Sequence, residues 1–229
     1  MKRNGLLIES MFNLNVLTYS FSALLSNRVP AVWKAASYPS LKSMRGFFGD
    51  LLERLQFFKS WFEEGQPSVF WLPAFYFPQS FLTGVLQTVA RKKRVPVDCL
   101  FHQCRVMTIS MAEPESISPP AEGVYVRGLF LAGARWDTEE QSLAEQRPKI
   151  LWEEMPILWL IPSDSKKPVQ AGPDEYYTCP LYRTSERHGV LSTTGHSTNF
   201  VMELDLPSGR LKPSHWIKRG VALITQSDD

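Results

Sequence analysis

The sequence has few cysteines and no long hydrophobic run. Its 229 residues include only 3 cysteines, Cys99, Cys104 and Cys179. An odd and sparse set is unlike the paired disulfides of a small secreted domain, so it favours a reducing compartment, the cytoplasm. No apolar run approaches the roughly 18 residues that a membrane-spanning helix needs. Glu9 and Asn13 interrupt the first apolar run before it could act as a signal peptide. These absences exclude a disulfide-rich secreted domain and a membrane protein.

An excess of charge of one sign is also lacking. Lys and Arg number 25 against 23 Asp and Glu, which leaves a formal net charge of +2. The longest basic run is Arg91–Arg94, so the chain has no electrostatic footprint for nucleic acid. We interpret this run as the charged last turn of a helix, with a contact for an acidic partner as the alternative.

Motifs that bind a nucleotide phosphate are missing as well. The sequence contains neither Gly-x-x-x-x-Gly-Lys-Ser/Thr nor Gly-x-Gly-x-x-Gly. Cys99, His102 and Cys104 lie close together, but a tetrahedral zinc site needs four ligands, and a strand would place Cys99 and His102 on opposite faces. We therefore expect no nucleotide cofactor and no metal.

One segment is similar to the nucleophile elbow of hydrolases. Residues 195–199 read Gly-His-Ser-Thr-Asn, with Ser197 as nucleophile and Asp205 and His215 as nominal partners. An elbow needs a helix after the serine, whereas residues 198–206 have the alternation of a strand. We interpret the segment as a tight turn in which hydroxyl groups and His196 satisfy backbone groups. We expect no catalytic residue, and a hydrolase built on Ser197 is the alternative.

The first part of the chain has the periodicity of helices. Residues 10–27 and Leu41–Phe62 carry apolar residues three and four apart, and Pro78 begins a third helix that ends in the basic run. We expect the stripe on the second helix to be core, with binding of a partner helix as the alternative. This stripe consists of Leu41, Met44, Phe48, Leu51, Leu55, Phe58 and Phe62.

From Pro96 onward the pattern changes to that of strands and turns. Strands are predicted over residues 97–105, 123–137, 150–161, 176–182, 200–206 and 216–225, and a loop or short helix over 138–148. Pro180 favours an edge position for its strand, because proline cannot donate to a ladder. The prediction is an α+β fold, with a helical subdomain over residues 1–95 and an antiparallel sheet or incomplete β-barrel over residues 96–229.

Several motifs together resemble a known family. They include Gly-Leu-Phe-Leu from Gly128, Gly-Ala-Arg-Trp-Asp over residues 133–137, Thr-Gly-His-Ser over 194–197 and Trp-Ile-Lys-Arg-Gly over 216–220. In this order, over nearly the whole chain, they are similar to the C-terminal domain of dynein heavy chains, and the Gly-Ala-Arg-Trp-Asp motif resembles axonemal forms. The residues that we assign to a structural role are Gly128, Gly133, Trp136, Asp137, Thr194, Gly195, His196, Trp216, Arg219 and Gly220.

The resemblance implies a structural and regulatory domain of a microtubule motor. In the family this domain follows the sixth AAA+ module, lies across one face of the motor ring and holds no catalytic residue, since ATP is hydrolysed in the ring. The expected partner is the AAA+ ring of the same heavy chain, with other dynein subunits as further candidates and only indirect contact with microtubules. The expected location is the cytoplasm, the cytoskeleton and the axoneme of a cilium or flagellum.

Two interpretations of the chain follow from the resemblance. It begins at Met1 with no ring module before it, which fits a fragment of a heavy chain. It also fits a stand-alone interaction module derived from the domain. For a fragment, we expect the helical face over Leu14–Leu25, or Arg91–Arg94, to belong to an interface and to leave an exposed apolar patch.

Overall fold

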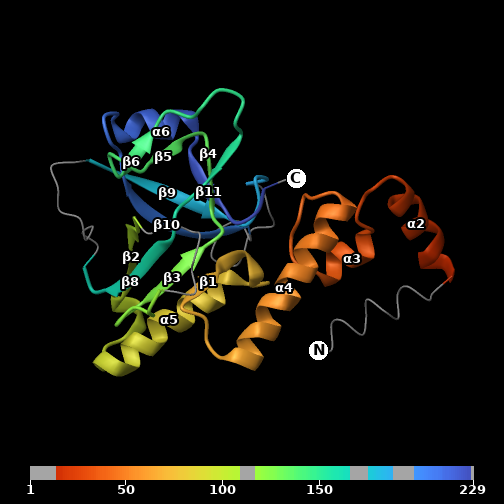
Figure 1. The fold of residues 1–229 in the computed structure, drawn as a ribbon, viewed down its shortest axis with the longest axis horizontal. Coiled ribbons are helices and arrows are strands. Elements are labelled where there is room, and N and C mark those ends of the chain that lie inside the picture. Colours follow the sequence, from red (N-terminus) through yellow and green to blue (C-terminus); the bar gives the residue numbers. More distant parts are fainter. Residues whose placement is uncertain (1–13, 109–116, 166–174, 188–198, 228–229) are drawn as a thin grey trace.

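The protein consists of a strand-rich body and a helical arm. The computed structural model describes residues 14–108, 117–165, 175–187 and 199–227. Helices α2 (Leu14–Leu25), α3 (Ala31–Ala36) and α4 (Met44–Glu64) extend to one side of the body (Figure 1). Helix α5 (Pro78–Lys93) and helix α6 (Pro213–Arg219) lie against opposite ends of the strands.

The strands are short. The earlier strands along the chain are β1 (Val69–Trp71), β2 (Phe101–Val106), β3 (Val124–Arg127), β4 (Phe130–Ala132), β5 (Arg135–Asp137) and β6 (Ser142–Ala144). The later strands are β7 (Trp152–Glu154), β8 (Leu158–Ser163), β9 (Tyr176–Tyr182), β10 (Phe200–Pro207) and β11 (Ala222–Ile224). Short 3₁₀ turns lie at Leu72–Ala74 and Val97–Cys99.

The strands form mixed sheets. Their orders are β1-β3-β8-β2, β10-β9-β11-β4-β7 and β5-β6. The predicted α+β class is confirmed, but the sheets are not purely antiparallel, because β1 pairs with β3, and β11 with β9, in parallel. Strand β1 belongs to the first 95 residues and pairs with β3 beyond them. The division of the chain at residue 96 stays a prediction.

The arm and the body are each stabilised by an apolar cluster of their own. The large cluster joins the two main sheets with α5 and α6, and Trp216, Leu131 and Leu158 at its centre are fully buried. The small cluster packs α3 against the start of α4 and contains Val29, Trp33, Tyr38, Met44 and Phe47. The arm therefore has a core of its own.

Helix α4 buries a different face from the predicted one. Its buried residues are Met44, Phe47, Asp50 and Arg54, and of the predicted stripe only Met44 is buried. Phe62 is 91% exposed. The expectation that the stripe forms core was wrong, because α4 carries apolar side chains on two sides and only one of them is buried. On the other side, Phe48 and Phe58 still contact the rings of Trp33 and Phe75.

The predicted strand over residues 216–225 is helix α6 followed by β11. Pro213 occupies the first turn, where its missing N–H costs nothing, and Gly220 ends the helix with a φ of 63°. This proline and glycine pair is a helix signal that the apolar alternation concealed. The strand is reduced to Ala222–Ile224.

Two further predictions need correction. Strand β9 lies between β10 and β11 rather than at an edge. Its pairing with β11 involves only Leu181 and Tyr182, so Pro180 lies outside that ladder. Residues 142–144, predicted as loop or helix, form β6 and pair with β5.

Candidate functional site

The motif glycines shape the turns between β3, β4 and β5. Gly128 has a φ of 82°, and a Cβ on it would lie 2.5 Å from Cδ1 of Trp71. Gly133 also has a φ of 82° and faces Val221. Both conformations are ones that side chains rarely adopt, so these glycines let the chain turn twice within a few residues and let Trp71 pack on the backbone.

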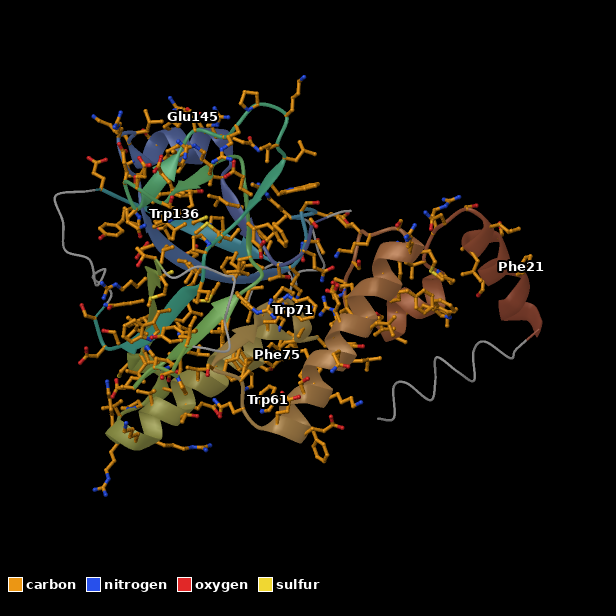
Figure 2. All side chains as sticks on the ribbon, viewed as in Figure 1. Phe21, Trp61, Trp71, Phe75, Trp136 and Glu145 are labelled. Atoms are coloured by element: carbon orange, nitrogen blue, oxygen red, sulfur yellow. The ribbon has the colours of Figure 1, made fainter. Side chains whose placement is uncertain are left out.

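Trp136 and Asp137 also have structural surroundings. Trp136 is buried in the large cluster (Figure 2). Oδ1 of Asp137 accepts hydrogen bonds from the backbone N–H groups of Glu139 and Glu140 at 3.0 and 3.2 Å. The bonds from Glu140 and Glu139, and then the ion pair with Arg135, hold the pKa of Asp137 below its ordinary value. The carboxylate fixes a turn after β5.

The last motif joins α6 to the turn at Gly133. Trp216 is fully buried and donates from Nε1 to the backbone oxygen of Ser208 at 3.1 Å. Arg219 donates from Nε to the backbone oxygen of Gly133 at 3.3 Å and pairs through Nη1 with Glu145 at 2.7 Å. The structure thus brings Gly133 and Arg219 together. Thr194, Gly195, His196 and Ser197 lie outside the described residues.

The other groups that could carry chemistry have ordinary structural partners. Asp205 accepts from the hydroxyl of Thr178 at 2.7 Å, and His215 pairs with Glu145 at 2.7 Å. The two nominal partners of Ser197 are thus engaged with other side chains. In the described part of the chain, no three His, Cys, Asp or Glu side chains gather in a way that could hold a metal ion.

The buried titratable groups of the body are kept neutral. Burial lowers the pKa of His102, whose Nε2 lies 3.1 Å from the backbone oxygen of Leu82. Burial raises the pKa of the Cys104 thiol to about 12 and also raises that of Cys179. The two thiols are therefore poor ligands and poor nucleophiles at neutral pH.

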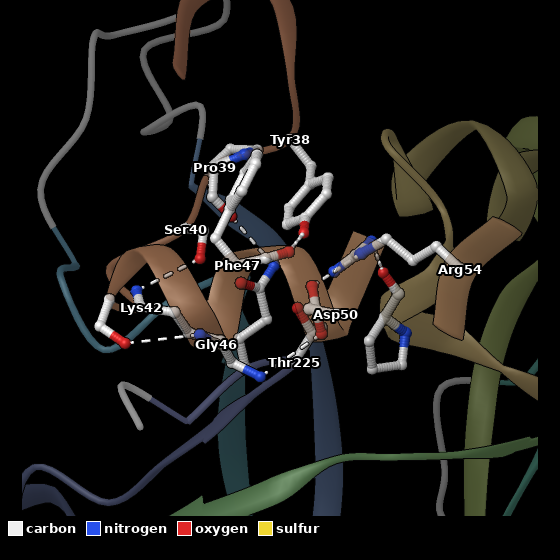
Figure 3. Close-up of polar contacts among 12 residues, drawn as sticks. Tyr38, Pro39, Ser40, Lys42, Gly46, Phe47, Asp50, Arg54 and Thr225 are labelled. Carbon is white, nitrogen blue, oxygen red and sulfur yellow. Dashed lines mark hydrogen bonds and ion pairs between the residues drawn. The ribbon is translucent and has the colours of Figure 1, made fainter. Parts of the chain in front are cut away.

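Sequence analysis missed a polar junction between the arm and the body. Arg54 is 1% exposed, and its Nε lies 2.8 Å from Oδ2 of Asp50 (Figure 3). Its Nη1 donates to the backbone oxygen of Pro73, and its Cζ lies 3.7 Å from the centre of the Tyr38 ring. Lys42 approaches Oδ1 of Asp50 to 3.4 Å. The signal in the sequence was an Asp and an Arg four residues apart on one helix.

The end of the last strand also reaches this junction. Gln226 donates from Nε2 to the backbone oxygen of Pro39 at 3.0 Å. Thr225 donates from its hydroxyl to the backbone oxygen of Arg183 at 2.9 Å. Gln226 therefore ties the connector before α4 to the end of the last strand.

An exposed apolar face runs along the outside of α4. We call it the α4 seam, and its members follow the three and four spacing of a helix-packing face. They are Phe48, Leu52, Leu55, Phe58 and Phe62, with exposed fractions of 41%, 63%, 49%, 37% and 91%. Phe21, Leu24 and Leu25 on α2 are exposed as well (Figure 2). A row of large exposed apolar side chains marks an interaction surface.

The exposure of Phe21, Leu24 and Leu25 agrees with the apolar patch expected on the helix over Leu14–Leu25. The burial of its side chains is described from residue 20 onward. Among the described residues, no helix has the length and apolar character needed to cross a membrane.

Comparison with known proteins decides the family. Residues 12–225 match the family of the C-terminal domain of the dynein heavy chain. The chain belongs to this family. The relatives of this dynein domain include dynein axonemal heavy chain 3 of Mus musculus, 47% identical over 209 residues, which are 91% of this chain and 5% of the relative. Dynein axonemal heavy chain 12 of Homo sapiens is 47% identical over 207 residues, which are 90% of this chain and 6% of the relative. Dynein axonemal heavy chain 1 of Rattus norvegicus is 48% identical over 207 residues, 90% of this chain and 4% of the relative. The dynein domain thus corresponds to a small part of each relative.

Proposed function

We propose that this protein is the C-terminal structural and regulatory domain of an axonemal dynein heavy chain, and that it braces the AAA+ ring of that heavy chain without catalysing a reaction. Membership of the family supports the assignment to a dynein, and the similarity to axonemal heavy chains supports a location in the axoneme of a cilium or flagellum. Contact with microtubules would then be indirect, through the motor.

The observation that carries the bracing role is the α4 seam. Leu52 and Leu55 are 63% and 49% exposed, although leucine side chains at this spacing normally lie in a core. The helix does not need this face for its own packing, because Met44 and Phe47 already fill the small cluster. The seam is therefore available to a second surface, which we assign to the ring.

A domain that braces the ring also needs a rigid connection between its arm and its body. Arg54 connects α4 to Tyr38 and to the backbone oxygen of Pro73, and Pro73 lies in the 3₁₀ turn that follows β1. Movement of whatever contacts the seam would be passed to the body through these contacts. In that way the domain would favour some conformations of the ring over others.

The proposal can be tested by adding the domain back to a motor that lacks it. An axonemal dynein motor without its C-terminal domain is mixed with the wild-type protein, and complex formation is measured by sedimentation together with ATP turnover. We expect the protein to bind and to change the turnover rate. The variant with Leu52→Gln, Leu55→Gln and Phe62→Gln should bind about 30-fold more weakly or worse, because central apolar anchors dominate interfaces.

The matched control is Glu63→Gln, which changes an exposed residue of the same helix and should bind like the wild type. Equal binding of wild type and seam variant would contradict the assignment of the seam. Absence of binding by the wild type would favour the alternative of a stand-alone interaction module.

A further inference from the structure

A cleft of about 800 Å³ lies between α4 and the sheets of the body. Its α4 wall includes Glu53, Trp61 and Glu64, and its opposite wall includes Trp71 and Arg127. This volume is in the range of sites that bind ligands, roughly 300 to 1,000 Å³. Part of the polar junction borders the cleft, whereas no residue of the α4 seam lines it.

The floor of the cleft is aromatic. The ring of Phe57 lies 6.1 Å from that of Trp61 and 6.3 Å from that of Trp71, measured between centroids. Gly128 leaves room for the Trp71 ring, because any side chain at position 128 would collide with it. All three residues are partly exposed and line the cleft, so part of each ring is within reach of a ligand.

The rim of the cleft offers hydrogen-bond acceptors that lack donors. Within the described residues, Glu53 and Glu64 form no ion pair or side-chain hydrogen bond. Gln226 lines the cleft and is 5% exposed, and its Oε1 has no partner in the described part of the chain. Buried acceptors are normally paired, so this oxygen points to a missing donor.

The cleft and the α4 seam lie on opposite sides of the helix. At 3.6 residues per turn, Phe57 and Glu64, which line the cleft, fall about half a turn away from Leu55 and Phe62. A surface that covers the seam would leave the cleft open. The occupant of the cleft is therefore separate from the body that covers the seam, and the inference does not depend on what that body is.

We propose that the cleft binds an arginine-bearing segment of a partner protein. The guanidinium group stacks on the aromatic floor and donates to Glu53, Glu64 or Oε1 of Gln226. Arginine fits better than lysine, because its planar group stacks on rings and donates in several directions at once. Arg127 on the opposite wall repels a second basic residue, so the segment carries a single arginine with neutral or acidic neighbours.

The probe for this proposal is a random library of 12-residue peptides displayed on phage and selected on the whole protein. We expect the selected peptides to share one arginine. The best of them is labelled with fluorescein, and its dissociation constant is measured by fluorescence anisotropy, beside the same peptide with Arg replaced by Gln. The Gln peptide should bind at least about tenfold more weakly, since it lacks both charge and stacking.

The matching protein variant is Glu53→Gln with Glu64→Gln, both on the exposed rim, so that folding is preserved. We expect this variant to bind the arginine peptide about fivefold more weakly, and Glu63→Gln, which does not line the cleft, to bind it like the wild type. Selected peptides without arginine would overturn the proposal. So would equal binding by the rim variant, or binding that is lost only when the α4 seam is changed.

Discussion

The guanidinium group of Arg54 lies over the ring of Tyr38, with 3.7 Å between Cζ and the ring centre, while its Nε pairs with Asp50. Burial, and then the Asp50 charge, raise the pKa of Tyr38 far above its ordinary value. The Tyr38 side chain is therefore neutral, and its ring packs against the charged guanidinium group of Arg54. Removal of that charged group would leave Asp50 buried with Lys42 as its remaining partner at 3.4 Å.

For this reason we expect Arg54→Ala to lower the free energy of unfolding by about 3 to 5 kcal/mol. Urea denaturation followed by tryptophan fluorescence measures the change. The control is Arg45→Ala on the exposed side of the same helix, which should shift the free energy by no more than about 0.5 kcal/mol. Similar values for the two variants would mean that the buried contacts of Arg54 contribute little.

Gly128→Ala should destabilise the protein by about 2 kcal/mol or more, because it combines an unfavourable φ with a collision against Trp71. Gly49→Ala is the matched comparison. Gly49 lies inside α4, and a methyl group added there would meet no atom within 4 Å, so alanine should raise the free energy of unfolding by about 0.5 to 1 kcal/mol. Thermal unfolding of both variants should show shifts of opposite sign.

Some elements could be predicted from sequence because local signals agreed with the tertiary structure. Helix α5 begins at Pro78 and ends in basic residues as predicted, and β10 is a strand whose Leu204 and Leu206 are buried as the alternation indicated. The buried side of α4 could not be predicted by periodicity, since aromatic and apolar residues lie on two sides of it. The buried pair of Asp50 and Arg54 was the distinguishing feature.

The cleft was beyond prediction for a different reason. Its walls combine residues near position 60, position 127 and position 226, and only the packing of α4 on the sheets brings them together. The sequence likewise indicated a structural role for Gly128 but did not indicate its neighbour. Its close contact with Trp71 depends on the parallel pairing of β1 with β3, which no local pattern indicated.

The pH dependence of stability should have a component from His102. Burial lowers its pKa in the folded protein below the ordinary value of 6.5, so the unfolded chain binds a proton first as the pH falls. This contribution to stability is complete above pH 6.5 and is lost as the pH falls from there toward the lowered pKa of the folded state. His102→Gln should weaken the loss, measured by urea denaturation at a series of pH values. Identical pH profiles would show that His102 is not the responsible group.

The α4 seam should tolerate polar substitution in the isolated protein. Leu52→Gln and Leu55→Gln remove exposed side chains and keep a good helix former, so each should change the free energy of unfolding by no more than about 0.5 kcal/mol. Phe47→Gln is the buried comparison on the same helix, at 2% exposure, and should cost about 3 kcal/mol or more. A large loss in the seam variants would place the seam in the core instead.

The three thiols should differ sharply in reactivity. Cys99 is exposed, whereas Cys104 is partly buried with a pKa raised to about 12 and Cys179 is fully buried. We expect iodoacetamide at pH 8 to modify Cys99 alone in the folded protein and all three in urea, with peptide mass spectrometry as the measurement. Rapid modification of Cys179 in the folded state would contradict the burial described above.

The hydrogen bond between Gln226 and Pro39 joins residues 187 positions apart. During synthesis, Pro39 leaves the ribosome long before Gln226 is made, so the connector before α4 has to wait for almost the entire domain. Until then the early helices rely on their own small cluster around Trp33 and Phe47, with the α4 seam uncovered. The nascent arm thus presents apolar side chains to solvent while the strands are still being translated.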